Sequence, residues 1–212
     1  METSEALSII STICSSLLTE ADLFSFICGN EREPSGIGET EVMSSGEKVY
    51  PQHFWARMFT VNPDGKKLYL LTPGDSSHFW WRDPLHILAW AWHPSCGDRF
   101  YLFEDRTQTA QVIDLNVMTQ DGHCSYLPDK RWILCDTYPG KERNQNPYNV
   151  ETRKRHPLGH FYSSPQYEWE WRCDTHPRFS PDGRKVVIDS PHGGNGRQMY
   201  LIDISRIVKV GA

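Results

Sequence analysis

The sequence lacks an excess of basic residues, which limits the partners that it can bind. It has 27 acidic against 22 basic side chains and a formal net charge of −5. We expect no nucleic-acid partner, because phosphate recognition needs a concentrated basic surface. The basic cluster at 153–156 is interpreted as a solvated loop.

Long apolar runs are also missing. No stretch reaches the ~20 uninterrupted apolar residues of a membrane-spanning helix, so no membrane association is expected. The first basic residue is Arg32, whereas a secretory signal carries its positive charge ahead of its apolar core. We therefore expect a cytoplasmic location by default, with a periplasmic or secreted one as the alternative if a further segment precedes Met1.

The six cysteines include no C-x-x-C pair, which argues against a zinc ribbon or a redox dithiol. Free thiols are the expected state. Cys124 and Cys173 flank two histidines of the repeat described next, so thiolate ligation stays open beside the commoner role of a small buried residue.

What the sequence does contain is a repeat with a constant offset of 53 residues. Six polar or turn residues of one copy recur in the other: Asp121, His123, Pro128, Asp129, Arg131 and Asp136 match Asp174, His176, Pro181, Asp182, Arg184 and Asp189. Looser copies precede them, with turn prolines at Pro63 and Pro94. A period of roughly 40 to 50 residues is typical of a β-propeller blade.

The repeat predicts an all-β protein made of β-propeller blades. We expect about four four-stranded antiparallel blades over 49–212, which leaves little to close a ring. The chain is therefore expected to be part of a larger ring, with a small or truncated propeller as the alternative. Apolar spacings of three and four over Ser4–Cys28, ended by Gly29, predict a helix. Residues 1–48 then form a helix and linker. Open blade edges favour self-association.

The repeated histidines are candidate metal ligands. His123 and His176 each follow an aspartate by two residues, at the start of a blade, where two imidazoles could converge. Mn²⁺ and Zn²⁺ accept neutral imidazole, and an adjacent Asp could fix its tautomer. His192 and Gln198 could complete such a set.

A structural role is the alternative for this pattern, because repeated Asp and His residues in propellers often form hydrogen bonds that join neighbouring blades. The earlier copies favour a function instead. They carry Met58 and Ala89 at the histidine position, although a purely structural histidine would be useful in every blade.

The segments "DGHCSY", "RWILCDTYP", "EWRCDTHPRFSPDGRKVVIDSPHGGNGRQMYLIDIS" and "SHFWWRDP" resemble propeller proteins related to oligogalacturonate lyases, within the Tol-type F-S-P-D-G repeat superfamily. The resemblance covers about Tyr50 to Ala212. It implies a seven-bladed ring with a central divalent metal, usually manganese, and β-elimination of pectin oligomers.

Carried onto this chain, the resemblance implies metal ligands, a catalytic set and substrate contacts. The candidate ligands are His123, His176, His192 and Gln198; Arg82 and Arg172 would pair with the uronate carboxylate, His78 would act as the base and Trp81 would contact the substrate. This chain departs from the family pattern, in which a Gln and two His cluster in one segment, because His176, His192 and Gln198 are spread out.

Two functions follow as hypotheses, and the sequence leaves open whether the protein is an enzyme. The first is a metal-dependent lyase acting on acidic oligosaccharides. The second is a non-catalytic propeller that binds a glycan or a protein, including a truncated propeller without a complete site. Bound metal and a histidine-lined channel mouth would favour the first.

Overall fold

A computed structural model describes residues 24–29, 41–42, 48–49, 56–72, 75–139, 144–145, 148–151, 153–168 and 171–208. The chain divides into two compact units, Met1–Ser76 and Ser77–Ala212. Within these ranges every regular element except a single helical turn residue is a strand, so the all-β prediction is confirmed.

The first unit corrects the predicted N-terminal helix. Residues 24–29, the end of the predicted helix, form strand β1 (Phe24–Gly29), and 1–23 lie outside the described residues. β1 pairs antiparallel with β4 (Ala56–Val61) over its whole length. The strand conformation prevails over the helical spacing because pairing with β4 satisfies backbone groups of both strands.

The other described strands of the first unit are short. β5 (Tyr69–Leu70) follows β4 in the sheet order β1-β4-β5, and β2 (Glu41–Val42) pairs with β3 (Lys48–Val49). The buried Thr72 hydroxyl accepts a hydrogen bond from the backbone N–H of Met58, which closes the β4–β5 hairpin.

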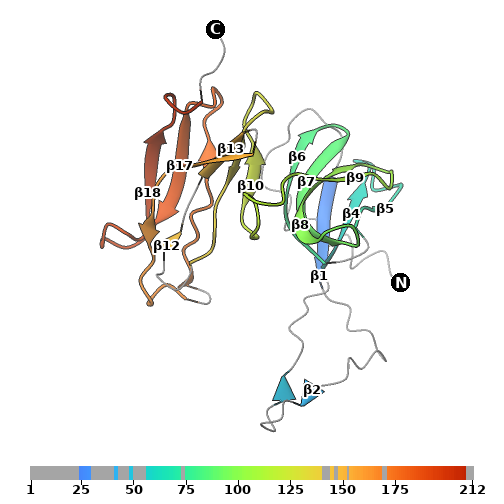
Figure 1. The fold of residues 1–212 in the computed structure, drawn as a ribbon, viewed down its shortest axis with the longest axis horizontal. Helices are drawn as coiled ribbons and strands as arrows, with labels where there is room; N and C mark the ends of the chain where they lie inside the picture. Colours follow the sequence, from blue (N-terminus) through green and yellow to red (C-terminus); the bar gives the residue numbers. More distant parts are fainter. Residues whose placement is uncertain are drawn as a thin grey trace. The chain divides into compact units, whose positions relative to one another are not determined.

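The second unit contains three blade-like sheets in chain order (Figure 1), which supports the prediction of propeller blades. The first sheet consists of β6 (Ser76–Asp83), β7 (His86–His93), β8 (Gly97–Glu104) and β9 (Ala110–Val112). The second consists of β10 (Cys124–Tyr126), β11 (Ile133–Cys135), β13 (Tyr148–Glu151) and β14 (Lys154–Pro157), and the third of β16 (Arg178–Phe179), β17 (Lys185–Ser190) and β18 (Gln198–Asp203). β12 (Asn144–Gln145) pairs with β15 (Phe161–Tyr162).

The repeat seen in the sequence is also a repeat of turn geometry. After Pro63, Pro94, Pro128 and Pro181, the N–H two residues beyond the proline donates to the carbonyl of the residue before it. Gly183 adopts a left-handed conformation with φ 67°, and Lys130 adopts the same conformation at the matching position with φ 58°. The register is repeated too, because Tyr126 pairs with Ile133 and Phe179 with Val186.

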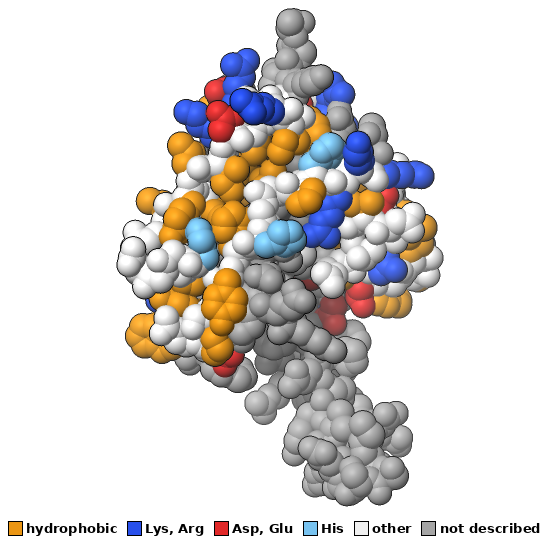
Figure 2. Space-filling view, turned by 60° about the vertical axis from the view of Figure 1, so that its left-hand side comes forward, with side chains coloured by type: hydrophobic (Ala, Val, Ile, Leu, Met, Phe, Trp, Pro, Cys, Tyr) orange, Lys and Arg blue, Asp and Glu red, His pale blue; other side chains and the backbone are white. Residues whose placement is uncertain are grey.

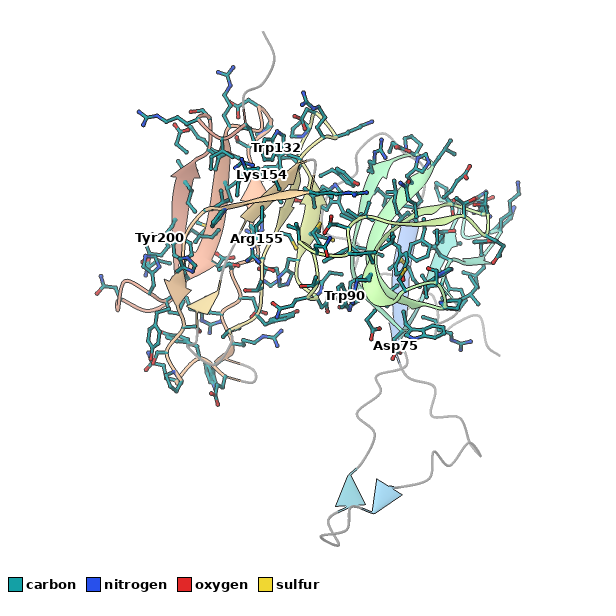
Figure 3. All side chains as sticks on the ribbon, viewed as in Figure 1. Asp75, Trp90, Trp132, Lys154, Arg155 and Tyr200 are labelled. Carbon is teal, nitrogen blue, oxygen red and sulfur yellow. The ribbon has the colours of Figure 1, made fainter. Side chains whose placement is uncertain are left out.

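Two hydrophobic cores lie on either side of the β10–β11 hairpin. Alternate residues of β11 point to opposite faces, so Ile133 and Cys135 join a core with residues of β7 and β8, whereas Leu134 joins a core with Val186 and Ile188 of β17. Trp132, labelled in Figure 3, belongs to the second core. Its ring centroid lies 5.2 Å from that of His156. This packing fixes β10 and β11, which carry the site described below.

Within the described ranges the structure has no helix that is both long and apolar enough to cross a membrane.

Candidate functional site

The first histidine of the repeat is held by a buried carboxylate. His123 immediately precedes β10 and Asp136 immediately follows β11, so the hairpin places them opposite each other. One Asp136 oxygen accepts the His123 backbone N–H at 2.7 Å, and the other lies 3.0 Å from His123 Nδ1 and 2.6 Å from the Thr175 hydroxyl. Because a carboxylate only accepts, Nδ1 carries the proton and Nε2 is left as the basic nitrogen.

This close approach requires Gly122. A Cβ added there would lie 2.1 Å from the Asp136 carbonyl oxygen, well inside contact distance. The glycine of the "DGHC" motif therefore lets the chain pass directly beside the carboxylate that orients His123.

A second histidine reaches the same place from the β6 strand. His78 Nδ1 lies 3.0 Å from a carboxylate oxygen of Asp121 and 3.0 Å from the Ser77 hydroxyl. On the other side of the ring, the Tyr138 hydroxyl lies 3.1 Å from Nε2. With the proton on Nδ1, Tyr138 donates to Nε2, so Asp121, His78 and Tyr138 form one hydrogen-bonded chain.

Tyr138 is a protonated phenol in this setting. Burial raises its pKa, and the negative charge of Asp121 raises it further. The guanidinium of Arg172 lies 4.9 Å from the centre of the Tyr138 ring and acts in the opposite direction.

The second histidine of the repeat departs from the first. His176 is exposed and has a left-handed backbone with φ 38°, which is uncommon for a residue with a Cβ. With this backbone, the N–H of Asp189 donates to the carbonyl of Thr175 and not to that of His176. The Asp189 carboxylate pairs with Arg178 at 3.1 Å, and His176 has no carboxylate partner of the kind that holds His123 among the described residues.

The ring of His176 packs, tilted, against that of His123 instead. Their ring centroids are 3.7 Å apart, and the His78 ring lies 4.4 Å from that of His123. Partial burial lowers the pKa of His176, and the neighbouring His123 lowers it further. Three imidazoles, two from blade starts and one from β6, therefore meet at one place.

A buried carboxylate completes this group. Asp174 Oδ2 accepts a 2.8 Å hydrogen bond from Arg172, but Asp174 Oδ1 is buried and has no hydrogen-bond partner among the described residues. One ligand atom each from His123, Asp174 and His176 lie within 4.8 Å of one another. Two imidazoles and a carboxylate are donors that a divalent cation of the first transition row accepts.

Other predicted residues have different neighbours. His192 Nδ1 lies 2.9 Å from the Ser190 hydroxyl and its ring packs on Tyr200, while the Gln198 side chain donates to the Asn195 carbonyl within a hairpin. His192 does not belong to the group of His, Cys, Asp and Glu ligand atoms found in the described ranges. Trp81, on β6, is half-buried.

Thiolate ligation is not favoured by the setting of the two cysteines beside the histidines. Cys124 and Cys173 are both buried free thiols. Burial raises the pKa of each, that of Cys124 most strongly. Both therefore stay protonated and act as small core residues.

Sequence reasoning missed Tyr138 and treated Asp174 only as a residue that orients a histidine. Tyr138 lies in the segment "CDTYP", whose counterpart in the other copy reads "IDSPH". The repeat therefore gave no signal for the tyrosine, although its position just beyond a strand matches that of other site residues.

Comparison with known proteins identifies the fold. No protein-family model and no curated protein matches the chain. Among solved structures, TolB from Acinetobacter baumannii matches with a TM-score of 0.55 at 21% identity, covering 70% of this chain and 35% of TolB. Putative TolB from Agrobacterium tumefaciens matches with a TM-score of 0.48 at 13% identity, covering 70% of this chain and 52% of the other. A manganese complex of oligogalacturonate lyase matches with a TM-score of 0.40 at 12% identity, covering 71% of this chain and 55% of the lyase.

The match to A. baumannii TolB shows that the chain has the fold of a TolB-like β-propeller segment, which confirms the predicted resemblance at the level of fold. The chain spans about a third to a half of the length of the solved structures that it matches. At these identities the comparisons carry no information on activity.

Proposed function

We propose that the chain carries a divalent-cation site next to a proton-transfer pair, and that both serve β-elimination on an acidic oligosaccharide such as oligogalacturonate. The observation that carries the proposal is the hydrogen-bonded chain of Asp121, His78 and Tyr138, whose central ring packs against His123. Histidines that only joined blades would not need a tyrosine on their remaining nitrogen.

His123, His176 and Asp174 would hold the cation. Asp136, bonded to Nδ1 of His123, would leave Nε2 as the coordinating nitrogen, and Asp174 Oδ1 would gain the partner that it otherwise lacks. Imidazole nitrogens with a carboxylate oxygen suit Mn²⁺ or Zn²⁺. The cation would neutralise the uronate carboxylate and so make the neighbouring C–H more acidic.

The side chains of the chain itself would move the protons. Arg172 would pair with the uronate carboxylate, and Asp121 would keep His78 in the tautomer with a basic Nε2. That nitrogen would remove the proton next to the carboxylate; the electron pair of the C–H bond would form the double bond as the glycosidic C–O bond breaks. Tyr138, whose raised pKa keeps it protonated, would protonate the leaving oxygen.

A non-catalytic glycan-binding propeller is the second candidate, and exposed aromatic residues favour it. Trp171 is 66% and Tyr162 50% exposed, and such rings suit stacking on sugars. Figure 2 shows histidine side chains at the surface of one face among hydrophobic and basic side chains.

The experiment is an elimination assay on the purified protein with Mn²⁺ and oligogalacturonate, following the absorbance of the unsaturated product. We expect His78→Gln and Tyr138→Phe each to lower the rate by about 10²–10⁴-fold. His93→Gln, which changes a histidine bonded to Ser95 at a β7 turn, should react like the wild type. Binding of the oligomer without any product in a folded, metal-loaded protein would contradict the lyase and support the binding module.

A further inference from the structure

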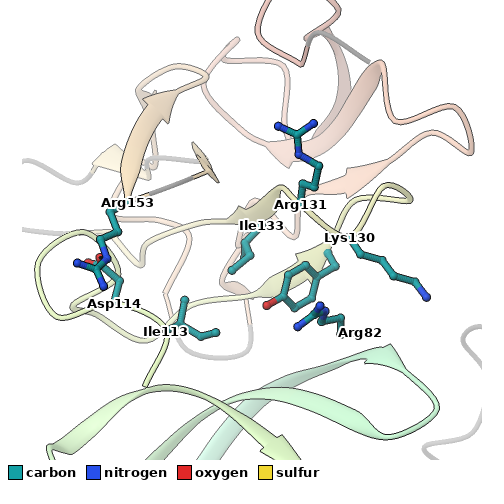
Figure 4. A pocket seen from close by; sticks show the side chains of 8 residues that line it. Arg82, Ile113, Asp114, Lys130, Arg131, Ile133 and Arg153 are labelled. Carbon is teal, nitrogen blue, oxygen red and sulfur yellow. Dashed lines mark ion pairs between the residues drawn. The ribbon is translucent and has the colours of Figure 1, made fainter. Parts of the chain in front are cut away.

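A cavity of about 250 Å³ lies in the second unit beside the hydrophobic core between β10 and the first blade-like sheet. Its apolar wall consists of Ile113, Ile133 and Tyr126. Around this wall stand four basic side chains and one acidic one, which are Arg82, Lys130, Arg131, Arg153 and Asp114. Figure 4 shows Arg82 beside the tyrosine ring at one end and the Arg153–Asp114 pair at the other, with the two isoleucines between them.

The cavity is separate from the histidine group. Arg82 follows His78 by four residues on β6, and a strand rises about 3.3 Å per residue, so the two Cα atoms are about 13 Å apart. Tyr126 likewise lies at the opposite end of β10 from His123. The same two strands therefore present histidines at one end and an arginine with a tyrosine at the other.

Arg82 lacks the partners that a buried guanidinium nitrogen normally has. Its guanidinium lies over the Tyr126 ring, 5.7 Å from the centroid. Its Nε is buried and makes no hydrogen bond to the described residues. The neighbouring Asp83 carboxylate comes only to 3.7 Å from this nitrogen through its Oδ2. Its other oxygen, Oδ1, accepts from the Leu85 N–H and pairs with His86 at 2.7 Å.

At the far end of the cavity, the acidic side chain already has its partners. Asp114 is buried and caps the N–H groups of Asn116 and Val117, and Arg153 reaches it at 3.9 Å with a largely exposed side chain. The acidic charge at this end is thus already satisfied. An incoming anion would meet an excess of positive charge and, at Arg82, an unsatisfied donor.

We propose that this cavity binds a small organic anion, with its oxyanion group on Arg82 and its apolar body against Ile113 and Ile133. An arginine supported by an aromatic face offers paired donors for a carboxylate or a phosphate. The volume lies below the ~300–1,000 Å³ of pockets for drug-sized ligands, so the ligand is compact. The site is independent of the elimination chemistry proposed above.

The test measures binding of benzoate and of phenyl phosphate to the full chain by NMR titration, with benzamide as the uncharged analogue. The two anions distinguish a carboxylate from a phosphate ligand. We expect at least one of them to bind with a Kd of about 1 mM or below, benzamide to bind much more weakly, and Arg82→Met to weaken binding about tenfold or more.

Arg57→Met is the matched control, because Arg57 also lies over an aromatic ring, that of Phe59 at 5.9 Å, in the other unit. It should bind the anions like the wild type. Loss of binding without loss of the folded spectrum in Arg82→Met supports the site. The proposal is overturned if neither anion binds the folded wild type, if Arg82→Met binds as well as the wild type, or if Arg57→Met loses binding equally.

Discussion

His123 and His176 occupy equivalent positions of a sequence repeat, yet only one of them is held by the aspartate of its own copy. Their ring centroids are 3.7 Å apart. Asp136 binds His123 and reaches across to Thr175, whereas Asp189 turns away to Arg178. The repeat thus supplies one oriented imidazole and one exposed imidazole at the same place, which suits a ligand pair better than a pair of structural ties.

The Asp136 carboxylate should be a major source of stability. It is buried and accepts from the His123 backbone and ring and from Thr175. We expect Asp136→Asn to lower the free energy of unfolding by about 2–4 kcal/mol. The charge-assisted hydrogen bonds are lost, and the new amide NH₂ is a buried donor that faces the donors of His123 and Thr175. Urea unfolding measures this. Asp189→Asn, which removes an exposed pair with Arg178, should cost below about 1 kcal/mol; equal losses would contradict the assignment.

Gly122 should tolerate no side chain. A Cβ there would meet the Asp136 carbonyl at 2.1 Å, so Gly122→Ala must move the backbone beside His123. We expect a loss of at least about 2 kcal/mol, together with altered shifts of the His123 ring in NMR spectra.

The comparison for this change is Gly194→Ala. Gly194 has φ 76° and no atom within 4 Å of an added Cβ. Gly194→Ala should lower the free energy of unfolding by about 1–2 kcal/mol, the cost of a left-handed backbone at alanine, and leave the His123 signals unchanged. A Gly122→Ala protein that keeps wild-type stability and His123 shifts would disprove the close approach.

His176 should titrate below the ordinary histidine value. Partial burial of its otherwise exposed side chain, and then the neighbouring His123, lower its pKa. Because the unfolded chain then binds the proton more readily than the folded one, this group lowers stability as the pH falls through the unfolded value of about 6.5, and the loss ends below the folded pKa. NMR titration of metal-free protein measures the pKa. His123→Ala should raise it in part; an unchanged or lower value would contradict the contact.

Much of the fold could be predicted from the sequence, because turns are local. Each Pro-Asp-Gly or related turn satisfies its own backbone groups, so Pro63, Pro128 and Pro181 indicated hairpins wherever they occurred. The helix predicted over Ser4–Cys28 was wrong at its C-terminal end. The spacing of apolar residues along the chain does not reveal a distant pairing partner, and β1 is a strand because it pairs with β4, about thirty residues later.

The site was predictable only as far as the repeat extends. His123 and His176 were found because both copies carry them, and His78 because of a resemblance. Tyr138 and the unsatisfied oxygen of Asp174 depend on which side chains meet across sheets, and no local pattern encodes that. The repeat also suggested equal roles for Asp136 and Asp189. Their roles differ in the structure, where His176 has a left-handed backbone.

The most direct test of the cation site is the metal stoichiometry of the full chain. Purified protein is stripped with a chelator, reloaded with Mn²⁺ or Zn²⁺, and measured by calorimetry and elemental analysis beside His176→Ala and Asp174→Asn, with His192→Ala as the matched histidine control. We predict about one metal per chain in the wild type and in His192→Ala, and its loss in the other two variants. A folded wild type that binds neither metal, or a metal lost only with His192, would contradict the site.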